Sequence, residues 1–109
     1  MQNKIRLTVL SICIAMPLAA MAQPVMSQRD LAGLSKQTKN VLHRYESCLH
    51  FAGEWSGDPK LDQYVRKRTQ ELGCAHIYQE VNQLRRTKNH RSQTLKLIKK
   101  LERAYGVSP

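Results

Sequence analysis

Apolar residues recur every three or four positions along residues 27–105, which is the spacing that one face of an α-helix requires. Apolar and polar residues never alternate for long enough to predict a strand. Polar or glycine-containing stretches that separate the periodic segments are short, and short connections favour antiparallel neighbouring helices. We therefore predict an all-α fold, a small bundle of about four short helices.

The first predicted helix begins after Ser27 and runs to Ala52. Ser27 and Asp30 have the spacing of a capping box, in which each side chain satisfies a free backbone N–H at the helix start. Gly53 is a natural stop. The apolar positions form a stripe about 120° wide, as expected of a helix that packs on a core. They are Leu31, Leu34, Val41, Leu42, Tyr45, Cys48, Leu49 and Ala52.

Three further helices are bounded by turn residues. Asp58 and Pro59 suit the N-cap and the first position of a second helix, which Gly73 ends. Its predicted inner face consists of Leu61, Tyr64, Val65 and Leu72. A third helix over 74–86 places one group of apolar residues on one side, namely Cys74, Ile77, Val81 and Leu84. The last helix is predicted at about 90–105.

The first 22 residues have the three parts of a secretory signal peptide. Residues 1–6 carry two positive charges and no acid, residues 7–18 are mostly apolar, and the segment ends in Ala20-Met21-Ala22. Within this segment the uncharged stretch, residues 7–22, has 16 residues, fewer than the roughly 20 that a membrane-spanning helix needs, which argues against an uncleaved anchor. We predict that 1–22 is removed and that 23–109 forms a single helical domain, periplasmic or secreted.

Two cysteines remain after the predicted cleavage, Cys48 and Cys74. An even number of cysteines in an exported chain favours a disulfide. Both lie on the inner faces of their predicted helices, and the chain between them is long enough for one helix and two turns. The sequence does not have the close cysteine spacing of a redox pair, whose cysteines are two residues apart. It also does not have the four closely spaced ligands of a structural zinc site. We predict a structural Cys48–Cys74 disulfide.

The sequence around Cys48 resembles a pattern in small secreted proteins of Gram-negative bacteria. The resemblance rests on Cys48-Leu49-His50-Phe51-Ala52-Gly53-Glu54, on Asp58, and on a second cysteine 26 residues after the first. It covers roughly residues 45–80. The resemblance implies a helical, disulfide-linked, periplasmic protein, and it implies no catalytic residue.

Charge separates the last helix from the rest of the chain. The sequence has 18 Lys and Arg against 8 Asp and Glu, and it keeps 16 against 8 once Lys4 and Arg6 are removed. From Arg85 to Pro109 there are eight basic residues and one acid. A basic stripe of Lys96, Lys99, Lys100 and Arg103 lies opposite an apolar stripe of Leu97, Ile98, Leu101 and Tyr105. The basic stripe is a candidate binding surface, and the alternative is the solvated outer face of a packed helix.

Phe51 and Trp55 stand four residues apart where the first helix ends. Aromatic side chains dominate binding hot spots, so the pair is a second candidate binding site. The alternative is that both rings close one end of the core over the disulfide. We favour that alternative, because a core this small needs its large side chains.

His43, Glu46 and His50 share one flank of the first helix. Histidine and carboxylate at these spacings can converge on a metal ion, yet the flank has no HExxH-type signature. We favour the alternative, a solvated flank in which Glu46 pairs loosely with Lys39 or His50. We predict no metal and no cofactor.

The chain has no Ser-His-Asp or Cys-His arrangement, no glycine-rich phosphate loop, no evident small-molecule site and no nucleic-acid-binding motif. We expect a protein that is not an enzyme. The first hypothesis is an exported binding protein, inhibitor-like or immunity-like, that acts by surface complementarity with an acidic protein partner. The alternative is a basic factor that binds phospholipid, lipopolysaccharide or nucleic acid through its C-terminal helix. That helix lacks Trp and Phe on its apolar face, which argues against insertion into a bilayer.

Overall fold

The computed structural model describes residues 24–107, so the predicted signal peptide lies outside the described residues. These residues form a one-turn helix and four longer ones, without any strand. The helices are α1 Gln28–Leu31, α2 Lys36–Ala52, α3 Pro59–Leu72, α4 Ile77–Arg86 and α5 Arg91–Ala104. The all-α prediction is confirmed. Within the described range, none of the helices has the length and apolar character needed to span a membrane.

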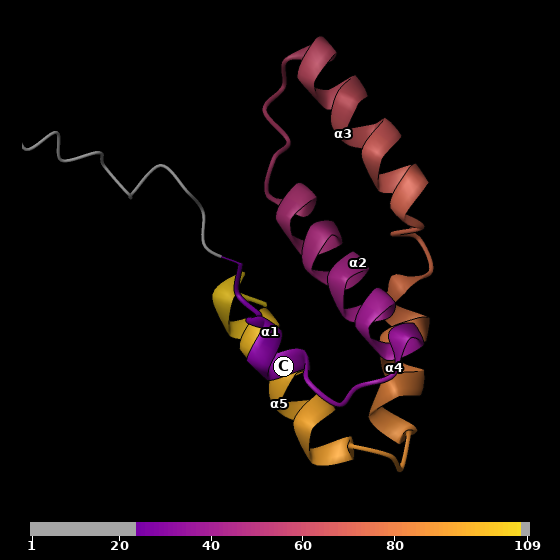
Figure 1. The fold of residues 1–109 in the computed structure, drawn as a ribbon. Helices are drawn as coiled ribbons and strands as arrows, with labels where there is room; N and C mark the ends of the chain where they lie inside the picture. Colours follow the sequence, from indigo (N-terminus) through magenta and orange to yellow (C-terminus); the bar gives the residue numbers. More distant parts are fainter. Residues whose placement is uncertain (1–23, 108–109) are drawn as a thin grey trace, which may run out of the picture.

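Helix α2 is the central element of the fold, and it contacts α3, α4 and α5 (Figure 1). Helix α5 packs mainly against α4, and the N-terminal segment that contains α1 lies along α5 (Figure 1). Helix α3 runs back along α2, and together they form a hairpin that projects away from α5 (Figure 1).

One hydrophobic core joins the N-terminal segment, α2, α4 and α5, and α3 lies outside it. Leu42, Ile98 and Leu101 are completely buried there. The buried members of this core are Met26, Leu31, Leu34, Leu42, Tyr45, Cys48, Leu49, Ile77, Val81, Leu84, Leu97, Ile98 and Leu101. Helix α3 contributes a single buried residue, Val65, which is not part of this cluster.

Capping residues set several helix ends as the sequence predicts. Ser27 and Asp30 form the capping box, because the Ser27 N–H donates to Asp30 Oδ2 at 2.9 Å and the Asp30 N–H donates to Ser27 Oγ at 3.1 Å. Asp58 caps α3, and Pro59 occupies its first turn. Gly73 ends α3 in the left-handed region at φ +69°, which is costly for other residues.

The predicted first helix is interrupted near Gly33, so the prediction of one continuous helix is wrong. Gly33 has φ +84°, and Ser35 then caps α2 by accepting a hydrogen bond from the Thr38 N–H at 3.1 Å. Leu31 and Leu34 remain buried on either side of the break. The apolar spacing therefore continues across the turn, which hides the break from a periodicity argument. The third helix also begins later than predicted, at Ile77, after a turn over residues 73–76.

The predicted inner face of α3 is wrong at two of its four positions. Val65 is 1% exposed, as predicted, and Leu72 packs against the edge of the core. Leu61 and Tyr64, however, are 40% and 54% exposed. The physical reason is that α3 has α2 as its main neighbour, with no further helix to cover the first half of this face.

Candidate functional site

The candidate site is the basic face of α5. Its apolar face is confirmed as core, because Leu97, Ile98 and Leu101 are each no more than 4% exposed. The four predicted binding residues lie on the opposite face, and all four are exposed: Lys96, Lys99, Lys100 and Arg103. Tyr105, at the end of the helix, is half-buried against the core.

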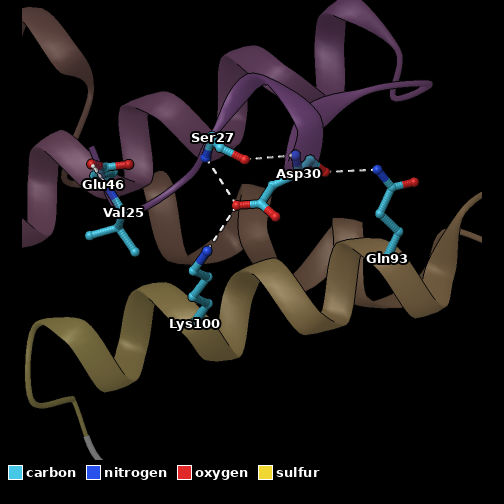
Figure 2. Close-up of polar contacts among 6 residues, drawn as sticks. All are labelled: Val25, Ser27, Asp30, Glu46, Gln93 and Lys100. Carbon is cyan, nitrogen blue, oxygen red and sulfur yellow. Dashed lines mark hydrogen bonds and ion pairs between the residues drawn. The ribbon is translucent and has the colours of Figure 1, made fainter. Parts of the chain in front are cut away.

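Lys100 differs from the rest of the stripe because it already has a partner. Its Nζ lies 2.8 Å from Asp30 Oδ2, so it binds α5 to the N-terminal segment (Figure 2). The Gln93 side-chain amide adds two hydrogen bonds, to the carbonyl oxygens of Asp30 and Ala32, both at 2.8 Å. Sequence patterns miss these contacts, since the partners lie more than 60 residues apart. Lys96, Lys99 and Arg103 are therefore the available part of the stripe.

The acidic residues of the described chain are all engaged in internal contacts. Four of them pair with Lys or Arg at 2.6–2.8 Å, namely Asp30, Glu71, Glu80 and Glu102. Glu54 lies 3.5 Å from His50, and Glu46 accepts a hydrogen bond from the Val25 N–H at 3.4 Å (Figure 2). Asp58 and Asp62 accept backbone N–H groups around the start of α3. Hence no carboxylate of the described chain neutralises Lys96, Lys99 or Arg103 by direct contact.

Glu102 is the one acid on α5, and it is held away from the stripe. Its carboxylate accepts from Arg85 of α4 at 2.8 Å, and its side chain is only 12% exposed. A groove of about 330 Å³ lies beside it, lined by Lys99, Glu102, Arg103 and Val107. Lys99 and Arg103 thus share this small hollow with the Glu102 carboxylate.

The candidate metal flank does not converge on a point. His43, Glu46 and His50 do line one groove of about 320 Å³, together with Phe51 and Tyr105. Within it His50 turns toward Glu54, and Glu46 is engaged with the backbone at Val25. Among the residues that the structure describes, no group of three or more His, Cys, Asp and Glu side chains is placed to hold a metal ion.

Phe51 and Trp55 occupy different environments. Phe51 is half-buried and makes an edge contact with Tyr64, with ring centroids 6.2 Å apart. Trp55 is 51% exposed, so the favoured expectation that it closes the core over the disulfide is wrong. Trp55 lies in the turn after α2, beyond the end of the core, where no other described helix covers it.

The predicted Cys48–Cys74 disulfide is present, and a second tie lies close to it. The two Cα atoms are 5.6 Å apart, which joins α2 to the turn after α3. The Arg44 guanidinium donates to both carboxylate oxygens of Glu80 at 2.8 Å and to the Leu72 carbonyl at 2.9 Å. Arg44 therefore holds α2, the end of α3 and α4 together. This bidentate ion pair carries no signal in the local sequence pattern.

Two of these carboxylates should make stability depend on acid pH. The hydrogen bond from Lys100, followed by that from the Ser27 N–H, lowers the pKa of Asp30 to about 2. The hydrogen bond from Arg44 likewise lowers the pKa of Glu80. Because each pKa is lower in the folded chain, each carboxylate stabilises the fold above its unfolded pKa of about 4, and this contribution is lost as pH falls toward the folded value.

We therefore expect Asp30→Asn to flatten the acid side of the stability profile. The melting temperature of the wild type should fall between pH 4 and pH 2, roughly the unfolded and folded pKa values of Asp30. The variant should start lower at neutral pH and fall less steeply. Thermal unfolding followed by circular dichroism at a series of pH values measures both slopes. Parallel profiles would contradict the role given to the Asp30–Lys100 pair.

Comparison with protein-family models, curated proteins and solved structures gave no match to this chain. The functional inference therefore rests on the surface that the chain itself presents. That surface is a helix packed on the core by its apolar face, with exposed cations whose field attracts anionic groups.

Proposed function

We propose that this chain is an exported, non-enzymatic binding protein of the inhibitor or immunity type, which recognises an acidic protein through α5. The proposal rests on a difference between the acidic and the basic side chains. Every acid of the described chain is engaged internally, whereas Lys96, Lys99 and Arg103 are exposed without a carboxylate partner. An acidic partner would supply carboxylates for these three cations, which contact none within the described chain.

The geometry of the stripe indicates which acidic surface would suit it. Lys96, Lys99 and Arg103 are spaced three and four residues apart, so they follow one line along α5 over about 10 Å. The opposite face is fixed in the core, so the helix presents these cations without having to fold on binding. Carboxylates in a matching row, as on one face of an acidic helix, are the expected counterpart.

An anionic polymer or membrane surface is the second candidate, and one observation favours it. Exposed cations continue beyond the stripe at Arg86, Lys88 and Arg91, which extends the positive field along the turn before α5. An extended field suits a polyanion better than a single acidic patch. Binding to lipid would be confined to headgroups, because Ile98 and Leu101 are buried in the core and unavailable to a bilayer.

Export is part of the proposal and has its own test. The disulfide and the lack of a membrane-spanning helix in the described residues are compatible with an exported protein. We expect mass spectrometry of a periplasmic fraction to find a chain that begins at Gln23 with Cys48 and Cys74 oxidised. A full-length species retained in the inner membrane would contradict this.

Reversal of the available stripe should weaken recognition without unfolding the protein. We expect Lys96→Glu combined with Lys99→Glu to slow association with the natural partner by about tenfold or more at low salt, since steering depends on these charges. Each exposed substitution should change the free energy of unfolding by no more than about 0.5 kcal/mol. Lys100 is left unchanged because it holds Asp30.

A matched control separates a local site from net charge. Arg29→Glu with Lys36→Glu changes the net charge by the same amount at exposed positions outside α5. The partner is first captured from periplasmic extract on the immobilised wild type, at low and at raised salt, and association is then measured by surface plasmon resonance. Recovery of one stoichiometric protein supports the first function, and salt-sensitive recovery of lipid or polymer supports the second. Equal loss in both double variants would contradict a site on α5.

A further inference from the structure

The hairpin of α2 and α3 leaves three large apolar side chains uncovered. Trp55, Leu61 and Tyr64 are 51%, 40% and 54% exposed, and they follow one another from the turn into α3. Tyr64 is fixed on its inner side by the edge contact with Phe51. We call Trp55, Leu61 and Tyr64 the hairpin patch. All three lie in α3 or in the turn before it, and Val65 is the only residue of α3 that is buried.

The patch is exposed because α3 extends farther than the helix it packs on. The end of α3 lies level with Arg44, whose Nε donates to the Leu72 carbonyl at 2.9 Å. From that level α2 continues for 8 residues, to Ala52, which is about 12 Å, whereas the 14 residues of α3 span about 21 Å. The first turns of α3 therefore run beyond the end of α2, in the part of the hairpin that projects from the fold in Figure 1.

The charges around the patch indicate what covers it. Residues 54–72 contain four acids and four bases, so this segment is neutral in a chain that is otherwise strongly basic. The charges are also segregated along it. Residues 54–62 hold three acids and one base, and residues 63–72 hold three bases and one acid. An antiparallel copy of the same segment would place each acidic half against a basic half, and this is a match of net charge along the segment because its acids keep their internal contacts.

We propose that two copies of this chain associate through the hairpin patch, about a two-fold axis that sets α3 antiparallel to α3 of the second copy. A two-fold contact uses the same surface on both molecules, which this segment satisfies in apolar character and in charge order. The two hairpins together form a four-helix arrangement with Leu61 and Tyr64 near its centre and Trp55 toward its edge. A purely acidic partner matches this neutral segment less well than it matches α5.

The dimer would leave the proposed binding surface free. Helix α5 lies away from α3, with α2 between them (Figure 1). Two basic stripes on one dimer can engage two acidic sites, and the second contact then benefits from a raised effective concentration. Dimerisation does not depend on the proposed function, because it concerns different residues and is measured without any partner.

Trp55 provides a direct readout, because it is the only tryptophan of the chain. The oxidised protein spanning 23–109 is followed by sedimentation and by fluorescence from low micromolar to millimolar concentration. We expect the mass to double and the Trp55 emission to shift to shorter wavelength over the same concentration range, as the indole leaves water. A protein that stays monomeric throughout would overturn the proposal. A shift that appears only when another protein is added would instead assign the patch to that protein.

Variants locate the contact on α3. Tyr64→Glu and Trp55→Ser should each weaken dimerisation by at least about tenfold, as expected when a large aromatic residue is lost from an interface. Tyr78→Glu is the matched control, since Tyr78 is a 57% exposed tyrosine on α4, outside the patch. Lys67→Glu tests the charge order, because it adds an acid to the basic half. Dimerisation that is unaffected by the two patch variants, or equally affected by Tyr78→Glu, would show that the contact lies elsewhere.

Discussion

Replacement of Cys48 and Cys74 by serine is expected to lower the free energy of unfolding by about 2–4 kcal/mol. The bond closes a loop with a sequence separation of 26 residues, for which chain entropy gives roughly 3.5 kcal/mol. A domain of this size has about 5–10 kcal/mol in all, so the loss would be a large share of it. Urea denaturation of wild type and double variant, followed by circular dichroism, measures the difference.

The double variant should lose more stability in some helices than in others. Helix α3 has only Val65 buried, and beyond its packing on α2 it is held at its end by the disulfide and by the Arg44 contact to Leu72. Helix α5, by contrast, has four buried residues, three of them in the main core. We expect amide exchange in the double variant to accelerate first over residues 59–72, with α5 remaining protected at low temperature.

Two observations would contradict this account of the disulfide. Titration of the native exported protein could reveal two free, reactive thiols, in which case the bond does not form in the cell. Alternatively, exchange could accelerate equally over α3 and α5, which would mean that the bond has no local part in holding α3. Wild type with the disulfide reduced serves as the control, since it removes the bond without changing the sequence.

Sequence patterns predicted those parts of the fold that depend on neighbouring residues. The capping box at Ser27, the start of α3 at Asp58 and its end at Gly73 each need contacts only within a few residues, and all three are present. The disulfide was predictable because two cysteines in a chain with a predicted export signal favour a pair, although Cys74 lies in the turn before α4 and not on a helix face as predicted. The apolar face of α5 was predictable from helix spacing, as was the inner position of Cys48.

The features that the sequence did not predict depend on which helices pack against one another. The spacing of apolar residues along the chain does not contain that information. Lys100 looks identical to Lys99 in the sequence, yet only Lys100 meets Asp30, 70 residues away. Leu61 has the apolar character of a core residue, and it is exposed because α2 ends too early to cover it. The break at Gly33 did have a local signal, a glycine followed by the N-cap Ser35, which the continuous apolar stripe masked.

Leu101→Ala should destabilise the fold by about 2–5 kcal/mol, because Leu101 is completely buried and its truncation leaves a cavity in the core. In a domain of this size each kcal/mol lowers the melting temperature by about 4–8 °C. Lys99→Ala, two residues earlier on the exposed face, is the control and should change stability by no more than about 0.5 kcal/mol. Ile98→Val, with an expected cost of about 0.5–1.5 kcal/mol, gives a milder core variant if Leu101→Ala does not fold.

The same variants distinguish a folded recognition helix from one that inserts into a membrane. If α5 binds an acidic partner through its exposed face, then Ile98→Val should bind as well as the wild type below its melting temperature, and Lys99→Ala should bind more weakly. If α5 instead left the core to enter a bilayer, loosening the core would promote binding to anionic vesicles, and the core variant would bind more strongly than the wild type. Stronger vesicle binding by Ile98→Val would therefore contradict the proposal that α5 acts as part of the folded core.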